Sequence, residues 1–485
     1  MGDQRVTNDA QSYDLVVIGA GAAGSTIAAE TRALGAKVAL IEQWKVGGTC
    51  LNAGCDPTKT LVRSAEVLHL AQTAGRYGIV VDGARADWPA IRDRVETVID
   101  TIRGGDGDAN IRRSGVALYK GHARFRSPHE IEIDGETLHA DRAVIATGAR
   151  AVVPPIPGLA ETGFITNIEA VALARLPKSL AIIGGGVVAT EFAQIFGRLG
   201  VAVTMLNRRE RILPREEPEL TEALQDILRR EGIRIENSVR ARRIERDGTL
   251  ARIELERDGA PVPECGVETI LLATGRAPVV DDLGLEAAGV AYSKAGVEVD
   301  ATLRTTAPNI WAAGDVIAGG YPFTHVADYQ ARIVADNVLG RGRPREVDYA
   351  AVPWGIFTDP ELGRVGQTEA EALATGCQVR VARTRFRDIA RGITAGETDG
   401  LVKLVADRVT GRLLGAHILG ARGAELLGEA ALAIRLRLPA GAIADTLHAY
   451  PTLSEGVFWT AFELAKPESL LMDAVRGVQM PPGGD

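Results

Sequence analysis

Residues 14–24 read Asp-Leu-Val-Val-Ile-Gly-Ala-Gly-Ala-Ala-Gly, an apolar run that leads directly into a glycine-rich turn. The apolar part shows no alternation of polar and apolar side chains, which is typical of a parallel strand buried on both faces. The turn places Gly19, Gly21 and Gly24 in the spacing Gly-x-Gly-x-x-Gly, and a helical stretch and a second apolar run, Val38 to Ile41, follow it. Strand, glycine turn, helix and strand in this order predict a dinucleotide-binding unit.

Each glycine of such a turn has a mechanical role. The first permits the tight turn, the second lets the backbone approach a pyrophosphate, and the third lets the helix pack close to the strand. The phosphates then lie at the helix N-terminus, where unpaired N–H groups and the helix dipole favour negative charge. A turn that only connects a strand to a helix is the alternative, because one glycine motif alone is weak support for binding.

The same arrangement returns later in the chain. Residues 180–183 predict a strand, a Gly-Gly-Gly-Val-Val-Ala turn follows, and residues 201–206 predict the second strand. The distance from the first glycine to the polar residue closing the second strand is 23 positions in both copies, Gly19 to Glu42 and Gly184 to Asn207. Two copies in matching register make nucleotide binding the favoured interpretation. The second copy has these residues at the three motif positions: Gly184, Gly186 and Ala189.

The residue that closes each second strand distinguishes the nucleotides. Glu42 can accept hydrogen bonds from an adenosine ribose and repels a 2′-phosphate, which suits FAD or NAD. In the second copy the uncharged Asn207 is followed by Arg208 and Arg209, and two guanidinium groups suit a 2′-phosphate. NADPH is therefore favoured there over NADH, and solvated surface charge is the alternative reading of the two arginines.

Two cysteines lie five positions apart in a glycine-rich segment, Gly-Gly-Thr-Cys-Leu-Asn-Ala-Gly-Cys-Asp-Pro-Thr-Lys at 47–59. On a regular helix Cys50 and Cys55 would be too distant for a disulfide, so we expect an irregular segment, with Asn52 and Gly54 supplying the freedom. Pro57 predicts the first turn of a helix with Cys55 at its N-terminal end, where a thiolate is stabilised. A structural metal site is disfavoured because no second pair or nearby histidine completes four ligands.

Composition narrows the class of protein. A chain of 485 residues is too long to fold around one compact core, so more than one domain is expected. Its hydrophobic content of 46% is high enough for folded domains. A net charge of −8 argues against a nucleic-acid scaffold, and no stretch is apolar enough to span a bilayer. The N-terminus lacks the features of a secretion signal and only four cysteines occur, so we expect a cytoplasmic protein in which a close cysteine pair is catalytic.

With these motifs the chain resembles the class I pyridine nucleotide–disulfide oxidoreductases, which include dihydrolipoamide dehydrogenase, glutathione reductase and mercuric reductase. The resemblance covers nearly the whole chain. Besides the segment at 47–59 it rests on two Ala-Thr-Gly signatures (146–148 and 273–275), on Ile-Trp-Ala-Ala-Gly-Asp (310–315) and on Pro-Thr-Leu-Ser-Glu (451–455).

The resemblance implies an α/β fold with two Rossmann-like dinucleotide-binding domains, for FAD and NADPH, and an α+β C-terminal dimerisation domain. The expected order is an FAD-binding domain (1–152), an NAD(P)H-binding domain (153–276), a central segment returning to the FAD domain (277–347), a dimerisation domain (348–466) and a C-terminal tail (467–485). The implied assembly is a homodimer in which the partner's C-terminal segment completes each active site.

Residue roles follow from the same resemblance. Cys55 would be the proximal thiol, in charge-transfer contact with the flavin, and Cys50 the distal thiol that exchanges with substrate. Lys59 and Glu191 would form an ion pair beside the flavin ring. The implied nucleotide contacts, in addition to the two glycine turns, are Glu42, Gly48, Thr49, Lys59, Thr147, Gly148 and Asp315 for FAD, and Asn207, Arg208, Arg209 and Gly275 for NADPH.

The sequence departs from the family at the acid–base position. Disulfide-reducing members carry a histidine five residues before a glutamate; here Tyr450 stands five residues before Glu455. A phenol titrates about 3.5 units above imidazole, so it is a poor proton shuttle at neutral pH. His448 is an alternative shuttle, although we favour a structural role for it. Tyrosine at this place is similar to mercuric reductase, in which it faces the metal.

Two further features bear on the substrate. Residues 478–485 contain no vicinal cysteine pair of the kind that relays Hg(II), and no N-terminal Cys-x-x-Cys domain is present. Asp56, where the family usually has an apolar residue, is expected to cap the following helix, with like-charge repulsion of the Cys55 thiolate as the minority hypothesis. Cys265 and Cys377 are interpreted as small buried hydrophobes.

The favoured function is FAD-dependent transfer of electrons from NADPH through Cys50 and Cys55 to a metal ion, which the pair would bind as substrate, or to another small acceptor. The alternatives are a dihydrolipoamide dehydrogenase-like or low-molecular-weight disulfide reductase, and a flavin-binding regulatory protein that has lost catalysis.

Overall fold

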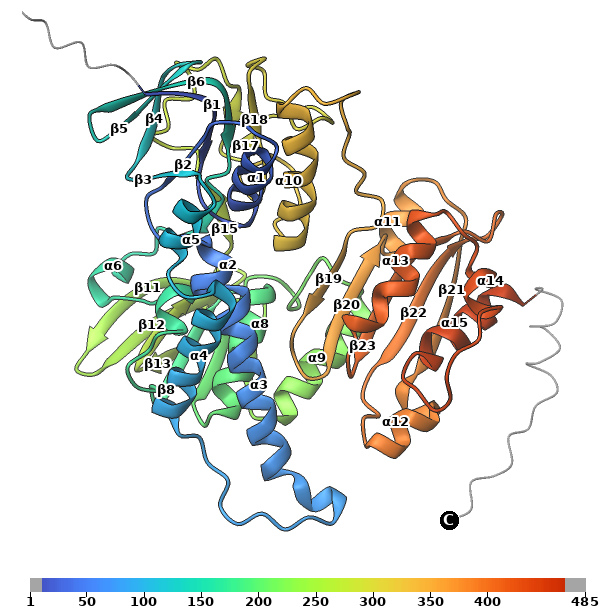
Figure 1. The fold of residues 1–485 in the computed structure, drawn as a ribbon. Helices are drawn as coiled ribbons and strands as arrows, with labels where there is room; N and C mark the ends of the chain where they lie inside the picture. The colour runs from blue at the N-terminus through green and yellow to red at the C-terminus, as the bar shows by residue number, and fades with distance from the viewer. Residues whose placement is uncertain (1–10, 467–485) are drawn as a thin grey trace, which may run out of the picture. The chain divides into compact units, whose positions relative to one another are not determined.

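The structure is a computed structural model that describes residues 11–466. The predicted C-terminal tail, 467–485, lies outside the described residues. The described chain forms two compact units (Figure 1). The first unit comprises residues up to 208 together with 232–348, and the second comprises 209–231 together with 349–466.

A seven-stranded sheet forms the centre of the first unit, in the order β3-β2-β1-β6-β5-β4 with β18 beside β6. Its central strands are parallel, with Val17 opposite Leu40 on one side and Val144 on the other. All three side chains are fully buried, which explains the unbroken apolar runs in the sequence. The strands are β1 (Gln11–Ile18), β2 (Val38–Glu42), β3 (Ala117–Lys120), β4 (Ala123–Ser127), β5 (Glu130–Ile133), β6 (Glu136–Ile145) and β18 (Ile310–Ala312).

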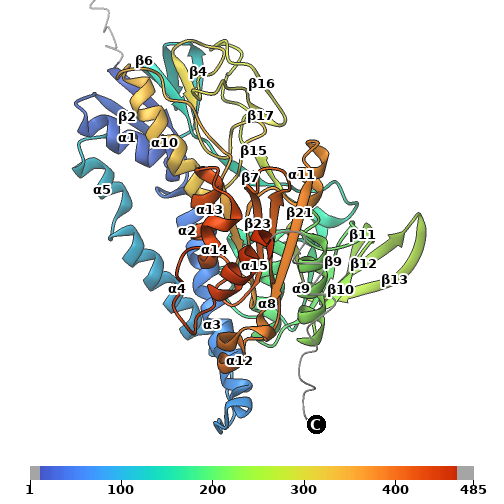
Figure 2. The ribbon, with the colours of Figure 1, turned by 90° about the vertical axis from the view of Figure 1, so that its right-hand side faces the viewer.

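Helices α1 (Ala22–Ala33) and α10 (Thr324–Val338) lie side by side against this sheet (Figures 1 and 2). Although they are about 300 positions apart in sequence, each buries an apolar stripe in the same core, with Ile27 and Ala28 from α1 and Ile333 and Val334 from α10. The segment around β18 and α10 thereby joins the sheet that contains β1.

The second glycine turn belongs to a four-stranded parallel sheet of the order β10-β9-β8-β14. Beside it lies a three-stranded antiparallel sheet, β11-β12-β13. The elements are β8 (Ser179–Ile183), α8 (Val187–Arg198), β9 (Ala202–Leu206), β10 (Arg234–Glu236), β11 (Arg240–Asp247), β12 (Leu250–Arg257), β13 (Ala260–Val267) and β14 (Thr269–Leu272).

The cysteine segment forms α2 (Gly48–Ala53) and α3 (Cys55–Gln72), and α4 (Trp88–Arg103) packs along α3. The helix α4 begins where the Asp87 side chain accepts a hydrogen bond from the N–H of Ala90, and it ends at Gly104 in the left-handed region. Shorter elements of this unit are α5 (Gly107–Arg113), α6 (Leu159–Thr162), α7 (Asn167–Ala170), the 3-10 helix η1 (Ala74–Tyr77), β7 (Ala149–Ala151), β15 (Arg276–Pro278), β16 (Tyr292–Ser293) and β17 (Gly296–Val297).

The second unit is built on a five-stranded antiparallel sheet of the order β19-β20-β23-β22-β21, with α13, α14 and α15 on one face (Figures 1 and 2). Residues 425–427 form a 3-10 turn that leads directly into α13 at Gly428. The elements are β19 (Pro353–Ile356), β20 (Glu361–Gly366), α11 (Glu369–Ala374), β21 (Val379–Arg385), η2 (Phe386–Asp388), α12 (Ala390–Ala395), β22 (Leu401–Asp407), β23 (Leu413–Gly420), η3 (Glu425–Leu427), α13 (Gly428–Arg435), α14 (Ala440–Ala444) and α15 (Glu455–Ala465).

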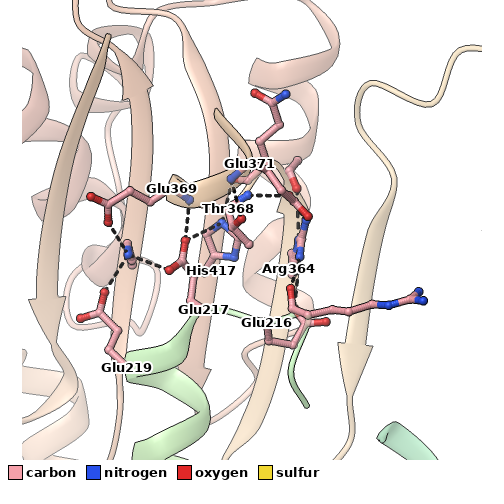
Figure 3. Close-up of polar contacts among 12 residues, drawn as sticks. Glu216, Glu217, Glu219, Arg364, Thr368, Glu369, Glu371 and His417 are labelled. Carbon is pink, nitrogen blue, oxygen red and sulfur yellow. Dashed lines mark hydrogen bonds and ion pairs between the residues drawn. The ribbon is translucent and has the colours of Figure 1, made fainter. Parts of the chain in front are cut away.

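Residues 209–231, which include α9 (Pro218–Arg230), belong to this second unit, although the sequence places them within 153–276. A group of charged side chains, which we call the clasp, holds them there (Figure 3). The ammonium of Lys403 lies 2.8 Å from Glu217, 2.9 Å from Glu219 and 2.8 Å from Glu369. Glu217 also accepts a hydrogen bond from the N–H of Glu369 at 2.7 Å.

The clasp continues around Arg364, whose guanidinium is buried. It donates to the carbonyl of Arg215 at 2.7 Å and pairs with Glu371, while Glu216 accepts a hydrogen bond from the Trp354 indole at 3.1 Å. Residues 215–219 are therefore tied to β19, β20, α11 and β22 by charged and polar contacts. Buried charges of this kind are held only where partners compensate their desolvation.

Candidate active site

Cys50 and Cys55 lie on two helices that are interrupted by a single residue. Cys50 is in α2 and Cys55 is the first residue of α3, with Gly54 between the helices at φ −124° and ψ −111°. A Cβ on Gly54 would lie 2.9 Å from the carbonyl oxygen of Thr49, so a side chain there would collide with the preceding turn. The expected irregularity is thus confined to Gly54. The expectation that Asn52 shares in it is wrong, because Asn52 is helical.

Both thiols are free in the structure, and each changes the pKa of the other. The hydrogen bond from the Cys50 thiol is the largest influence on Cys55 and lowers its pKa, whereas burial opposes this effect. The Thr324 hydroxyl, 3.4 Å from the Cys55 sulfur, and the Lys59 ammonium lower it further, so that the pKa of Cys55 is about 6. The same hydrogen bond, together with burial, raises the pKa of Cys50. The pair therefore holds a thiolate at Cys55 and a thiol at Cys50 at neutral pH.

Asp56 does not cap α3 as predicted. The N-cap residue is Gly54, no side chain makes a capping hydrogen bond, and Asp56 lies within the first turn. The helix can start before Pro57 because the N–H groups of a first helical turn have no acceptor within the helix. A proline, which lacks this N–H group, is therefore accommodated at the third position of α3. Burial raises the pKa of Asp56 and Lys59 opposes this, while the Asp56 charge raises the pKa of Cys55, as the minority hypothesis held.

Thr324 was not identified from the sequence. It is the first residue of α10 and lies 269 positions from Cys55. No spacing pattern links it to the cysteines, and only the packing of α10 against the first sheet brings its hydroxyl to the sulfur.

Lys59 and Glu191 form the expected ion pair. The Lys59 ammonium is 2.9 Å and 2.8 Å from the two carboxylate oxygens of Glu191. Lys59 lies one helical turn after Cys55 on α3, and the buried Glu191 lies on α8, so the pair connects the cysteine helix to the second nucleotide unit. Its place beside a flavin ring remains an implication of the resemblance.

The first glycine turn has the geometry that a bound dinucleotide requires. Gly19 has φ +102°, and a Cβ there would lie 2.3 Å from the carbonyl oxygen of Ala146. A Cβ on Gly24 would lie 1.8 Å from the Gly19 carbonyl, whereas nothing lies within 4 Å of one on Gly21. The N-terminus of α1, at the N-cap residue Gly21, has no side-chain cap, as expected for a helix end that binds phosphate.

The remaining residues expected at FAD lie around this turn. The Glu42 carboxylate accepts hydrogen bonds at 2.7 Å from the N–H groups of Ala20 and Trp44. Asp315 follows β18, where burial raises its pKa and Arg276, 3.8 Å away, opposes this effect. The residues present fit FAD: an uncapped helix end for phosphate, an acidic residue at the end of β2 for ribose, and a carboxylate for a hydroxylated chain. Gly48, Thr49, Thr147 and Gly148 lie in the loops and helix starts that border the same region.

The second glycine turn repeats this geometry. Gly184 has φ +143°, and a Cβ there would lie 2.2 Å from the Ala273 carbonyl oxygen, while Gly186 is open and begins the uncapped helix α8. The Asn207 side chain restricts position 185 to glycine, since a Cβ on Gly185 would lie 2.5 Å from the Asn207 side-chain amide. Asn207 is buried and donates to Asn237 at 2.9 Å, whereas Arg208 and Arg209 are exposed. Ala189 is buried within α8, and Gly275 follows β14 at φ +119°.

The expected substrate-facing residues lie in the second unit. The Tyr450 side chain is 75% exposed, whereas Glu455 is buried and accepts a hydrogen bond from the N–H of Thr452 at 3.1 Å. His448 contacts Glu429 at 2.9 Å through Nε2 and the Thr446 carbonyl at 2.9 Å through Nδ1. Both ring nitrogens of His448 are thus engaged, in agreement with its interpretation as a structural histidine.

The other two cysteines differ from each other. Cys265 is buried, as expected, but Cys377 is only half-buried and accepts a hydrogen bond from Thr375, so its interpretation as a buried hydrophobe is wrong. Within residues 11–466 no cluster of three or more His, Cys, Asp or Glu side chains could hold a metal ion. In the same part of the chain, every helix is too short or too polar to cross a membrane.

Comparison with protein families shows which family has this sequence. Residues 13–331 match the model described as pyridine nucleotide-disulphide oxidoreductase, and residues 352–461 match the dimerisation domain of the same family. The chain belongs to the pyridine nucleotide-disulphide oxidoreductases. Members of this family use FAD and a pyridine nucleotide, and the chain is a flavoprotein oxidoreductase that carries the family's dimerisation domain.

Individual oxidoreductases of the family are similar along nearly the full chain. A mercuric reductase of Bacillus cereus is 35% identical over 447 residues, covering 92% of this chain and 70% of that protein. A dihydrolipoyl dehydrogenase of Chlamydia muridarum is 34% identical over 478 residues, covering 97% and 99%. Among solved structures, the Cu(II) complex of the HOCl-induced flavoprotein disulfide reductase RclA from Escherichia coli is 33% identical with a TM-score of 0.84, covering 94% of this chain and 100% of that one.

Proposed function

We propose that this flavoprotein transfers electrons from NADPH through the Cys50–Cys55 pair to a soft metal ion or another small acceptor. The observation that carries the proposal is the thiol pair itself: Cys55, which forms a thiolate, lies at a helix start, and the Cys50 thiol is hydrogen-bonded to it. Two closely placed sulfur ligands favour soft ions such as Hg(II) and Cu(I). The relatives named mercuric reductase and the neighbour solved with Cu(II) point to the same class of substrate.

The chain's own residues divide the work. When bound, FAD supplies the two-electron relay between the nicotinamide and the sulfur pair. Lys59 stabilises the thiolate of Cys55, and Glu191 fixes the position of the Lys59 ammonium. Cys50, with its raised pKa, acts as the distal thiol that meets the acceptor. In the dimer, Tyr450 and Glu455 of the partner's C-terminal segment would complete the site.

The reaction balances in two steps. Reduction breaks the S–S bond and yields the Cys55 thiolate and the Cys50 thiol, which takes up the two electrons and the one proton released as NADPH becomes NADP⁺. Hg(II) then displaces the remaining proton from Cys50 and binds both sulfur atoms. The two thiolates give up two electrons, which reduce Hg(II) to Hg(0) while the S–S bond forms again. This cycle needs no acid–base histidine, because the metal ion itself displaces the thiol proton. The engaged ring of His448 and the phenol of Tyr450 suit it better than thiol–disulfide exchange.

The test follows NADPH consumption by the purified flavoprotein with different acceptors. We expect Hg(II) or Cu(II) salts to support continuous oxidation of NADPH, and lipoamide and glutathione disulfide to be poor acceptors. A Tyr450→His variant should gain activity with the disulfides. Rapid turnover of a disulfide by the wild-type protein, with no response to metal, would instead favour the disulfide reductase function suggested by the dihydrolipoyl dehydrogenase relatives.

The preference for NADPH rests on the residues after β9. Removing a guanidinium that bonds a phosphate costs about 1.5–3 kcal/mol, or roughly a tenfold to hundredfold loss. We therefore expect Arg208→Ala to lower kcat/KM for NADPH by about tenfold or more and to leave kcat/KM for NADH unchanged. The matched control is Arg112→Ala on α5, another exposed arginine of the first unit. An equal loss with both nucleotides would remove the argument for a 2′-phosphate contact.

A further inference from the structure

The helix that carries Cys50 cannot hold its position alone. Helix α2 has six residues, and helices this short are unstable without outside contacts. It has no side-chain cap at Gly47, and the chain turns away at Gly54, so the carbonyl of Ala53 is left without a partner within the helix. By contrast, α3 has 18 residues and buries Thr58, Leu61 and Ala65 in the first unit. The sulfur atom of Cys50 therefore lies on the less constrained helix, α2.

Asn167 supplies the missing partner. Its side-chain amide donates to the Ala53 carbonyl at 2.7 Å, although the two residues are separated by 114 positions. Asn167 is the first residue of α7, which starts with a capping box: the Thr166 and Glu169 side chains each bond the backbone at the other end of the turn. This box fixes the backbone of Asn167, and the amide is thus aimed at the end of α2 from a rigid support.

A second contact holds α2 from the side of α4. The Asn52 amide donates to the carbonyls of Val46 at 3.0 Å and Gly48 at 2.8 Å, which closes the start of α2. Its oxygen accepts a hydrogen bond from Arg103 at 2.9 Å. Cys50 thus lies on a short helix that is held by two hydrogen bonds from outside. Arg103 donates one to Asn52, and Asn167 donates the other to the last carbonyl of the helix.

We propose that Asn167 is a positioning residue for the redox pair, holding α2 so that Cys50 stays beside Cys55 both when the sulfur atoms are free and when they are bonded. The inference rests on the proposed function only in taking the Cys50–Cys55 pair as redox-active. Oxidation of the pair forms the S–S bond and releases two electrons and the proton of the Cys50 thiol. Its equilibrium depends on the effective concentration of one thiol at the other, which falls when α2 gains freedom.

The experiment measures this equilibrium in the flavoprotein without NADPH. Protein is incubated anaerobically in mixtures of reduced and oxidised dithiothreitol, free thiols are trapped by alkylation, and the Cys50–Cys55 disulfide is quantified by mass. In Asn167→Asp, an oxygen of equal size replaces the donor and repels the Ala53 carbonyl. We expect its equilibrium to shift about tenfold toward the dithiol, or about 30 mV for this two-electron couple. In Asn167→Ala, which only removes the donor, the expected shift is smaller.

The order of the variants separates a hydrogen bond from simple filling of space, because loss of volume alone would make Asn167→Ala the more severe change. The matched control is Asn309→Asp, where an asparagine amide donates to the Pro128 carbonyl at 2.9 Å, outside the redox segment; it should leave the equilibrium unchanged. Arg103→Met acts on α2 from the other side and should shift the equilibrium in the same direction. If Asn167→Asp does not fold, Asn167→Ala decides the test, because an unchanged equilibrium in that variant also overturns the inference.

An unchanged equilibrium in Asn167→Asp and Arg103→Met would overturn the inference. So would a larger shift in Asn167→Ala than in Asn167→Asp, or an equal shift in Asn309→Asp. Failure of the wild-type protein to pass electrons from NADPH to a metal ion is a different outcome, since it removes the proposed function while the dithiothreitol equilibrium still reports on Asn167.

Discussion

Cys50→Ser is expected to abolish NADPH-driven reduction of metal ions and disulfides, with a loss on the order of 10³-fold or more, as for removal of an enzyme's nucleophile. A serine hydroxyl does not form a bond to sulfur and binds soft ions poorly, so the variant lacks the distal half of the pair. The serine hydroxyl can still donate a hydrogen bond to the Cys55 thiolate, and Thr324 and Lys59 remain in place, so the change removes the second sulfur atom and keeps the contacts that stabilise the thiolate.

The measurement compares two acceptors in the same preparation. Ferricyanide takes electrons upstream of the cysteines, so NADPH oxidation by ferricyanide should stay near the wild-type rate while metal-dependent oxidation disappears. Cys377→Ser makes the same chemical change at a half-buried cysteine of the second unit and should leave both activities unchanged. Retention of metal-dependent activity in Cys50→Ser would mean that electrons reach the acceptor without this thiol.

Lys403→Met is expected to destabilise the protein by about 3–5 kcal/mol, the cost of leaving a buried charge without its partner. The side chains of Lys403 and Glu217 are each 3% exposed. Burial raises the pKa of Glu217, but the hydrogen bond from Lys403 and its other partners hold it below its ordinary value. Without the ammonium, the Glu217 carboxylate must either take up a proton or stay charged in a poorly solvated site.

Urea unfolding followed by circular dichroism measures this loss as a lower midpoint. Lys466→Met removes the other lysine cation of the described second unit, where it pairs with Glu463 near the surface, and should change stability by less than about 1 kcal/mol. The double variant Lys403→Met with Glu217→Gln should recover part of the loss, because no unpaired charge then remains at that contact. A Lys403→Met protein as stable as Lys466→Met would show that the clasp contributes little.

The sequence was sufficient where function depends on local pattern. The two glycine turns, the buried parallel strands and Cys55 at a helix start follow from residues within a few positions of one another. The family assignment and the α/β fold are confirmed by the comparisons. The error at Asp56 was also local: a residue before proline suits a cap, but the turn at Gly54 starts α3 earlier and leaves Asp56 inside it.

The contacts that the sequence did not reveal join distant segments. Thr324 reaches Cys55 and Asn167 reaches Ala53 only because separate helices pack against one core. Neither residue stands in a recognisable motif, and their side chains are common in ordinary turns and helix starts. Likewise, residues 209–231 follow the second nucleotide strand directly, so only the folded contacts of Lys403 and Arg364 reveal that they belong with 349–466.

The clasp also determines how this chain can be recombined with those of its relatives. A chimera that exchanges the nucleotide module by cutting at the ends of 153–276 would import a foreign 215–219 segment and leave Lys403 and Arg364 facing carboxylates they were not selected with. Hybrids that keep residues 209–231 together with 349–466 preserve every one of these pairs. Crossovers placed near Arg208 and near Gly232 should therefore give a larger fraction of folded hybrids than crossovers at the ends of 153–276.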